Sequence, residues 1–278
     1  MTDTSGIFKI SSAECRPFRL EFQMNVTHSL ASRNFTNNIL VEIQSDSGLS
    51  GFGECVPRKY VTGETTESVM KASGDIFPLL KEKSFSSPDE VVTFLQDLGM
   101  STIGTSNPAA LCAVELALLD LTGKNWGISV SDITGLKKRE ESLIYSLVVP
   151  FLNNDSLESF LMKAKTFGFK HVKIKVDARN PFTQVSRVKK ILGDEVEIRV
   201  DANCSWNRIN APVFLKELSE LGVVSVEQPL PSDDLEGCAN LRKESLMLIT
   251  LDESVSSITA VNRVARLGAC DVINIRIS

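Results

Sequence analysis

Charged residues stand at the ends of successive apolar runs in the second half of the chain. They recur every 24 to 26 positions, and each ends or closely follows a run typical of a β-strand: Lys175, Asp201, Glu227, Asp252 and Arg276. Three of them are carboxylates, whose hard oxygen atoms suit Mg²⁺ better than softer metals. Because the carboxyl ends of adjacent parallel strands meet at one edge of a sheet, the series predicts a metal site formed by Asp201, Glu227 and Asp252. The alternative is that these acids face solvent at separate strand ends.

A pair of lysines belongs to the first of these strand-like runs. Lys173 and Lys175 are separated by one residue, and side chains alternate along a strand with a period of two, so both point the same way. Two ammonium groups held side by side repel each other, which lowers the pKa of each and lets one act as a base near neutral pH. The alternative places both lysines on an outward face, with Ile174 directed inward.

Two further polar residues follow the acids closely. Asn203 lies two positions after Asp201, and Glu253 directly follows Asp252. We expect Asn203 to support the metal ligands through a hydrogen bond, and Glu253 to pair with a cation across the site.

The segments that must position these residues alternate between strand-like and helix-like patterns. We expect strands at residues 143–149, 172–176, 197–200, 223–227, 246–250 and 271–277. Helices are expected at residues 156–167, 181–192, 211–221 and 257–267, with a short helix inside 233–242. The alternation predicts an α/β fold, a (β/α) barrel, over residues 141–278.

Residues 1–140 show a different pattern. A hairpin is expected with strands at 39–43 and 52–56 about the turn SDSG. Helices follow at 67–83 and 88–98, and a third begins near Pro108 and stops at Gly123. This order predicts a separate α+β domain, with the boundary in the charged stretch at 138–143.

Composition narrows the classes of protein and of partner. The chain has 278 residues, of which 42% are apolar and 23% charged, enough for a sizeable core and two domains. A net charge of −5, spread over mixed acids and bases, disfavours nucleic acid as a partner. Without a membrane-length apolar run or a secretory signal, we expect a cytoplasmic protein with no membrane partner. The six cysteines lack zinc-ligand spacing and are expected to be free thiols.

Several of these segments together resemble the enolase superfamily, in its muconate-lactonizing subgroup. The barrel motifs are similar in order and spacing: KIK at 173–175, DANCSW at 201–206, EQPLP at 227–231, LDES at 251–254 and NIRIS at 274–278. The segments GFGECVP, YVTGET, AVELALLDLTGK and SDITG resemble that subgroup's N-terminal capping domain. The resemblance implies a barrel of TIM type behind a capping domain, covering nearly the whole chain.

The resemblance also implies a chemistry. Mg²⁺ would be held by the three acids, Lys175 would abstract a proton, and Lys173 would be its electrostatic neighbour. The substrate would be a small carboxylate whose α-proton is removed to give an enediolate.

The step after proton abstraction separates the candidate reactions. We favour a racemase or epimerase of dipeptides or N-acyl amino acids; the alternatives are a cycloisomerase and an o-succinylbenzoate-synthase-like dehydratase. Members that racemise use a second lysine in a motif resembling NIKxxK, and Arg276 stands at that position here. A guanidinium has a pKa above about 12 and is a poor base, so Arg276 favours a reaction with one base, in which the arginine stabilises the enediolate.

The number of expected strands is small for a complete barrel. Residues 141–278 provide about six strands, whereas a (β/α)8 barrel typically needs at least about 200 residues. We therefore expect an incomplete barrel in a truncated chain, without strands seven and eight. A partner, such as a second copy in a homo-oligomer, would cover the open wall. Alternatively, the chain is a non-catalytic remnant with a vestigial metal site.

Overall fold

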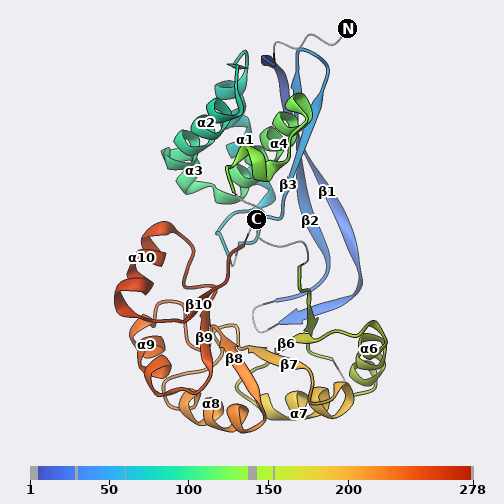
Figure 1. Ribbon diagram of the computed structural model, residues 1–278, viewed down its shortest axis with the longest axis vertical. Coiled ribbons are helices and arrows are strands. Elements are labelled where there is room, and N and C mark those ends of the chain that lie inside the picture. The colour runs from blue at the N-terminus through green and yellow to red at the C-terminus, as the bar shows by residue number, and fades with distance from the viewer. Residues whose placement is uncertain (1–5, 29–30, 60, 137–142, 153, 277–278) are drawn as a thin grey trace. The chain divides into compact units, whose positions relative to one another are not determined.

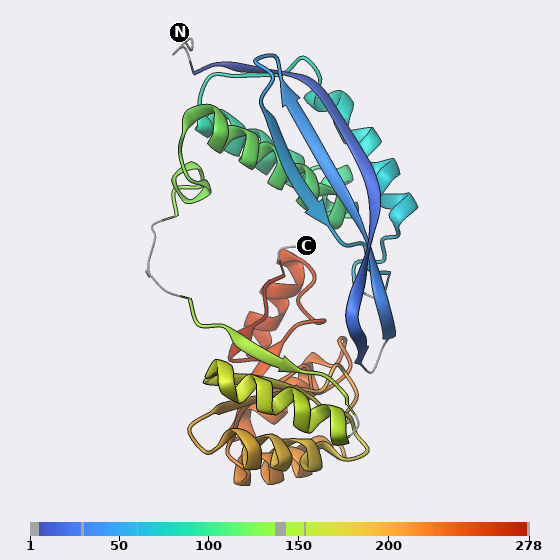
Figure 2. The same ribbon diagram turned by 90° about the vertical axis from the view of Figure 1, so that its right-hand side faces the viewer.

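The chain folds into two compact units. The computed structural model describes residues 6–28, 31–59, 61–136, 143–152 and 154–276. Unit 1 comprises Met1–Gln23, Asn34–Glu141 and Ile277–Ser278, and unit 2 comprises Met24–Arg33 and Ser142–Arg276. Most of the predicted boundary at 138–143 lies outside the described residues. Each unit is built around a sheet of its own (Figures 1 and 2).

A four-stranded sheet in the order β3-β2-β1-β4 belongs mainly to unit 1. Its strands are β1 (Phe8–His28), β2 (Ala31–Ser45), β3 (Ser50–Cys55) and β4 (Ser84–Phe85). The predicted hairpin is confirmed as the antiparallel pair of β2 and β3, in which Ile39 lies opposite Cys55 and Gln44 opposite Ser50. Gly48 has a φ of +82° in the connecting turn, a conformation that glycine adopts without steric cost. The strands β1 and β4 were not predicted.

Within the described residues, the helices of unit 1 lie beside this sheet. They are α1 (Thr66–Leu80), α2 (Pro88–Met100), α3 (Thr102–Ser106), α4 (Pro108–Trp126) and α5 (Val130–Ile133). Strand β3 lies directly on α4. The contact is so close that a Cβ atom at Gly53 would stand only 2.0 Å from the carbonyl oxygen of Ala113, which explains why this position is glycine. The predicted stop of α4 at Gly123 is wrong. The helix continues to Trp126 and ends at Gly127, which has the left-handed φ of +67° typical of a helix C-terminus.

Unit 2 is a six-stranded parallel sheet in the order β10-β9-β8-β7-β6-β5. The strands are β5 (Ser146–Val149), β6 (His171–Lys175), β7 (Glu197–Asp201), β8 (Val223–Glu227), β9 (Leu248–Leu251) and β10 (Val272–Ile273). The intervening helices are α6 (Asn154–Phe167), α7 (Pro181–Leu192), α8 (Ala211–Glu220), α9 (Leu235–Glu244) and α10 (Ile258–Leu267). These helices cover one face of the sheet (Figure 1), and fully buried side chains such as Ile174, Val200 and Val226 form the core between them.

The predicted βα alternation is confirmed throughout unit 2. Every expected strand and helix of the second half is present, although β5 and β10 are shorter than predicted. Among the described residues β5 and β10 are the outermost strands of the sheet. The parallel α/β architecture is therefore confirmed, while the prediction of an incomplete TIM barrel is not. None of the helices in the described ranges is both long and apolar enough to cross a bilayer.

Candidate active site

The register of the parallel strands sorts the polar residues into rows across the sheet. Lys175 pairs with Asp201, Asp201 with Glu227, and Glu227 with Thr250. The row before it contains Lys173, Arg199, Ser225 and Leu248. Partnered residues of neighbouring parallel strands point to the same face, and the alternate residues of these strands pack against the helices. Ile174 packs in the helix-covered core, so Lys173 and Lys175 lie on the opposite face of the sheet, where they contact the acids. The alternative that places both lysines on an outward face is therefore wrong.

A bulge in β8 brings Glu227 into this row. Ile198 is opposite Val223, but the next residue, Arg199, is opposite Ser225, so Val224 is an extra residue in β8. Without the extra residue, Asp201 would face Val226 and the carboxylate of Glu227 would be displaced from the row. Val224 is correspondingly 40% exposed between two buried neighbours. The bulge therefore places the second acid beside the first.

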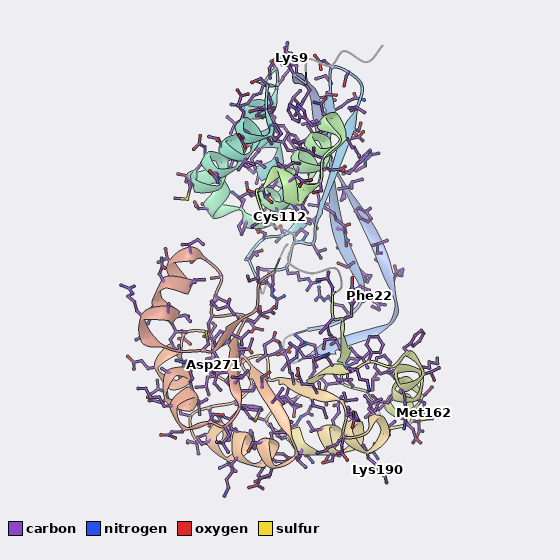
Figure 3. All side chains as sticks on the ribbon, viewed as in Figure 1. Lys9, Phe22, Cys112, Met162, Lys190 and Asp271 are labelled. Atoms are coloured by element: carbon purple, nitrogen blue, oxygen red, sulfur yellow. The ribbon has the colours of Figure 1, made fainter. Side chains whose placement is uncertain are left out.

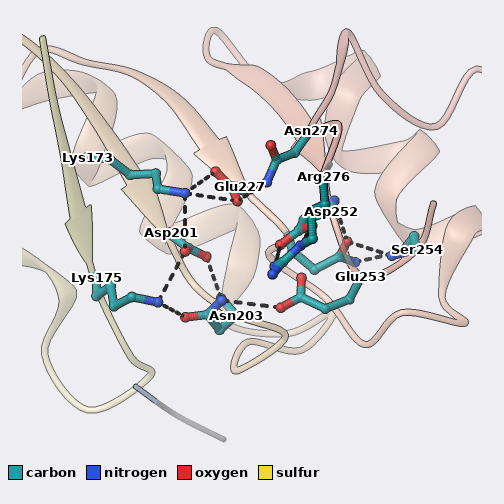
Figure 4. A network of polar contacts seen from close by, with 11 residues as sticks. Lys173, Lys175, Asp201, Asn203, Glu227, Asp252, Glu253, Ser254, Asn274 and Arg276 are labelled. Carbon is teal, nitrogen blue, oxygen red and sulfur yellow. Dashed lines mark hydrogen bonds and ion pairs between the residues drawn. The ribbon is translucent and has the colours of Figure 1, made fainter. Parts of the chain in front are cut away.

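Lys173 lies between two of the carboxylates (Figure 4). Its Nζ donates to Glu227 Oε2 at 2.9 Å and to Oε1 at 3.1 Å, and it lies 3.7 Å from Asp201 Oδ2. Burial acts to lower the pKa of Lys173, but the charges of Glu227 and Asp201 outweigh burial and raise it above its ordinary value. The predicted lowering of the pKa by the neighbouring lysine is therefore wrong for Lys173. The attraction of the two nearby carboxylates raises the pKa of its ammonium group.

Burial and like charge dominate at Glu227. Its pKa is raised, first by burial and then by the charge of Asp201, and the ion pair with Lys173 does not reverse this. An isolated ion pair would lower the pKa of its acid. The direction found here arises because burial and the charge of Asp201 together outweigh the charge of Lys173.

Lys175 reaches the same cluster from the end of β6. Its Nζ donates to Asn203 Oδ1 at 2.9 Å and lies 3.5 Å from Asp201 Oδ2. Asn203 in turn donates through Nδ2 to Glu253 Oε1 at 3.2 Å. The supporting role expected of Asn203 stays a prediction. In the described part of the chain Glu253 is joined to the amide of Asn203, not to a cation within ion-pair distance.

Asp252 lies at the other side of the cluster, paired with Arg276. Arg276 Nε donates to Asp252 Oδ1 at 2.7 Å, and a second guanidinium nitrogen bonds Asp252 Oδ2. The hydrogen bond to Asp252 raises the pKa of Arg276 above its already high value, so the guanidinium stays charged. Asn274 Nδ2 donates to Glu227 Oε1 at 3.1 Å, which ties the segment after β10 to the second acid.

Six of the eight predicted site residues thus form one set of polar contacts, and the other two, Asp252 and Arg276, form a pair that adjoins this set through the chain at Glu253 (Figure 4). The three acids are 3 to 7% exposed. As they stand, however, no three or more His, Cys, Asp or Glu side chains of the described residues lie close enough together to hold a metal ion. Each acid is instead turned toward a lysine or an arginine. The metal site stays a prediction.

Three residues of this region were missed by the sequence analysis. Asn274 and Ser254 lie inside the quoted NIRIS and LDES segments, and Gln228 lies inside EQPLP, yet none has a charge that would single it out. Gln228 also has a φ of +39°, and Asn203 and Cys204 have φ values of +43° and +62°. Left-handed conformations at residues other than glycine concentrate at functional sites, but they cannot be read from residue type.

Comparison with known proteins decides the family. Residues 14–135 match the model of the mandelate racemase/muconate lactonizing enzyme N-terminal domain, and residues 157–278 match the model described as enolase C-terminal domain-like. The chain is 32% identical to an L-Ala-D/L-Glu epimerase of Clostridium acetobutylicum over 258 residues, which cover 90% of this chain and 69% of the relative. The chain belongs to the mandelate racemase/muconate lactonizing enzyme family. The predicted superfamily and subgroup are confirmed.

Other members of the mandelate racemase/muconate lactonizing enzyme family agree with this assignment. An N-succinyl-L-Arg/Lys racemase of Bacillus cereus is 26% identical, with 97% of this chain and 72% of the relative covered. A solved dipeptide epimerase from Methylococcus capsulatus, complexed with Mg and the dipeptide L-Arg-D-Lys, is 25% identical and superposes with a TM-score of 0.86 over 97% of this chain and 75% of the other. Relatives also include an o-succinylbenzoate synthase and chloromuconate cycloisomerases. The family is thus one of isomerases and lyases.

These alignments bear on the predicted truncation. The alignments match 97% of this chain, and they cover 72% of the N-succinyl-L-Arg/Lys racemase and 75% of the solved dipeptide epimerase. The prediction that the chain is truncated is not confirmed.

Proposed function

We propose that the protein uses Mg²⁺ and a lysine to remove the proton α to a carboxylate, and that it racemises or epimerises dipeptides or N-acyl amino acids. The observation that carries the proposal is the buried contact of Lys173 and Lys175 with carboxylates at the ends of β7 and β8. The dipeptide epimerases and the N-succinyl amino acid racemase among its relatives support the choice of substrate.

The chemistry of the donor set fits Mg²⁺. Asp201, Glu227 and Asp252 supply hard carboxylate oxygens from three adjacent strand ends, and burial, followed by the charge of Asp201, raises the pKa of Glu227. These three residues would hold the ion. Bound there, Mg²⁺ would supply positive charge against the negative charge that develops on the substrate carboxylate as the α-proton leaves.

The two lysines have different surroundings, which suggests different roles. Lys173 is held by both oxygens of Glu227, so its nitrogen is engaged with the acid. Lys175 donates to the neutral amide of Asn203, and its side chain is 14% exposed at the end of β6. We therefore assign proton abstraction to Lys175, while Lys173 keeps Glu227 and Asp201 in place and contributes a fixed positive charge.

Arg276 favours a second candidate function. Racemisation needs a second acid or base on the opposite face of the substrate, and Arg276 is bound to Asp252 with its pKa raised, which makes it unsuitable. A reaction with one base, namely cycloisomerisation or the dehydration of an o-succinylbenzoate-synthase-like enzyme, would need only Lys175 and a charge-stabilising arginine. These reactions are the alternative.

Solvent deuterium exchange separates these functions. The protein is incubated in D₂O with Mg²⁺ and a panel of dipeptides and N-succinyl amino acids, and the α-position is followed by NMR together with chiral chromatography. A racemase or epimerase gives deuterium in both stereoisomers; an enzyme with one base gives exchange without inversion, or an eliminated or cyclised product. If no panel member exchanges and Mg²⁺ does not raise the unfolding temperature, the proposed function fails.

A further inference from the structure

Gln228, directly after Glu227, is completely buried, and every polar atom of its side chain is paired. It is 0% exposed. Its Nε2 donates to Leu230 O at 3.0 Å and to Ser254 Oγ at 2.8 Å. Its Oε1 accepts from the backbone N–H groups of Asp252 and Ser254, both at 3.1 Å. An amide side chain has two donor and two acceptor positions, so this set is complete.

The orientation of this amide follows from its partners. The backbone N–H groups of Asp252 and Ser254 can only donate, and the carbonyl oxygen of Leu230 can only accept. In a flipped amide, Nε2 would face the two backbone N–H groups, donor against donor. Oε1 would face the carbonyl oxygen of Leu230, acceptor against acceptor. Ser254 Oγ accepts from Gln228 and donates its own hydrogen bond to Ser232 O at 2.8 Å, so the hydroxyl is satisfied as well.

The backbone of Gln228 joins the neighbouring strand ends on both sides. Its N–H donates to Thr250 O in β9, and its carbonyl accepts from Cys204 N in the segment after β7, both at 2.9 Å. Cys204 follows Asp201 by three residues, while the side chain of Gln228 holds the N–H of Asp252. One residue thus connects the three strand ends that carry the predicted metal ligands.

We propose that Gln228 is a positioning residue that fixes the backbone of Asp252 and Ser254 and thereby sets the geometry of the three-carboxylate site. The metal part of this inference rests on the proposed function. Gln228 accepts from the backbone N–H of Asp252, so it acts through Asp252. Its left-handed φ of +39° is retained because six hydrogen bonds of its side chain and backbone hold it in place.

Two substitutions at position 228 distinguish the hydrogen bonds that the side chain accepts from those that it donates. Gln228→Met keeps the approximate length of the side chain but removes all four of its hydrogen bonds, and leaves the N–H groups of Asp252 and Ser254 without this acceptor. Gln228→Glu keeps an acceptor for these N–H groups and removes at least one of the donors to Leu230 and Ser254, although an ionised glutamate also adds a negative charge beside the acids. We expect Gln228→Met to weaken binding of Mn²⁺, used as the probe, by about tenfold to a hundredfold, and Gln228→Glu to weaken it less.

A matched control exists at the beginning of β9, the strand that precedes Asp252. Asp271 Oδ2 accepts from Ile249 N at 2.9 Å, near the beginning of β9, and its Oδ1 accepts from Arg242. Asp271→Ala therefore also removes a side-chain acceptor from a β9 N–H, but at Ile249, three residues before Asp252. We expect this variant to lose stability while Mn²⁺ affinity changes by less than about twofold.

The experiment measures Mn²⁺ binding by electron paramagnetic resonance of the free ion and amide hydrogen exchange at Asp252 and Ser254, in the full chain and all three variants. Faster exchange at these two amides and weaker Mn²⁺ binding in Gln228→Met, neither seen in Asp271→Ala, supports the proposal. Unchanged exchange, or a loss of affinity equal to that of the control, overturns it. If the unsubstituted chain binds no Mn²⁺, the proposed function fails, and the exchange rates alone decide whether Gln228 fixes this segment.

Discussion

Replacement of Lys173 by methionine tests the electrostatics of the site quantitatively. The substitution removes a cation that makes two hydrogen bonds to Glu227 and lies 3.7 Å from Asp201, and leaves two carboxylates that are 7% and 3% exposed without this partner. Removing one member of a buried pair costs about 3 to 5 kcal/mol. Because the Lys173 side chain is still 21% exposed, we expect the lower end, about 3 kcal/mol.

Urea unfolding in EDTA measures this loss directly. At about 2 to 4 °C per kcal/mol, the corresponding fall in unfolding temperature is about 6 to 12 °C. Saturating Mg²⁺ should recover part of the loss, since its charge would compensate the same carboxylates. The double variant Lys173→Met/Glu227→Gln should be more stable than the sum of its single changes predicts, by at least about 1 kcal/mol.

A surface lysine provides the control for this prediction. Lys190 is exposed on α7 (Figure 3), so Lys190→Met should change the free energy of unfolding by less than about 0.5 kcal/mol. If Lys173→Met in EDTA is also within about 0.5 kcal/mol of the unsubstituted protein, the two carboxylates do not depend on Lys173 and the electrostatic reasoning is refuted.

Three further predictions concern separate parts of the chain. Arg276→Met should raise Mn²⁺ affinity severalfold in a titration, because it frees Asp252 from a competing cation, and Arg276→Lys should raise it less; weaker binding by both would contradict this. Glu64→Ala should lower the free energy of unfolding by about 1 to 3 kcal/mol without changing Mn²⁺ affinity, because buried Glu64 accepts from two backbone N–H groups at the start of α4. Burial, followed by the neighbouring Cys112, raises the pKa of Cys55 to about 12, so its thiol stays protonated at pH 8. Labelling of the folded protein by iodoacetamide, followed by mass spectrometry, should therefore be slow at Cys55, and labelling at the rate of a free thiol would count against its burial.

The order of elements in unit 2 could be predicted because its signals are local. Apolar runs of strand length alternate with helical periodicity, and the charged residues fall where each strand ends. The residues that share a face in β6 follow from the period of two alone. This is why Lys173 and Lys175 were correctly expected to lie side by side.

Other features depend on contacts between distant segments and could not be predicted. The bulge at Val224 decides that Glu227 faces Asp201, and only the pairing of β7 with β8 reveals it. The raised pKa of Lys173 has the same origin, since its carboxylate partners come from two other strands. The role of Gln228 is hidden because a neutral amide has no distinctive pattern in sequence, and three of its side-chain hydrogen bonds reach Asp252 and Ser254, 24 and 26 residues away.

The central claim is that Asp201, Glu227 and Asp252 together hold a divalent cation, and anomalous scattering from Mn²⁺ in a crystal of the protein tests it most directly. The account predicts one Mn²⁺ ion bonded to a carboxylate oxygen of each of the three acids at about 2.0 to 2.3 Å, with Arg276 displaced from Asp252. An ion bound elsewhere, or the three acids still paired only with Lys173, Lys175 and Arg276 at saturating Mn²⁺, would contradict the claim.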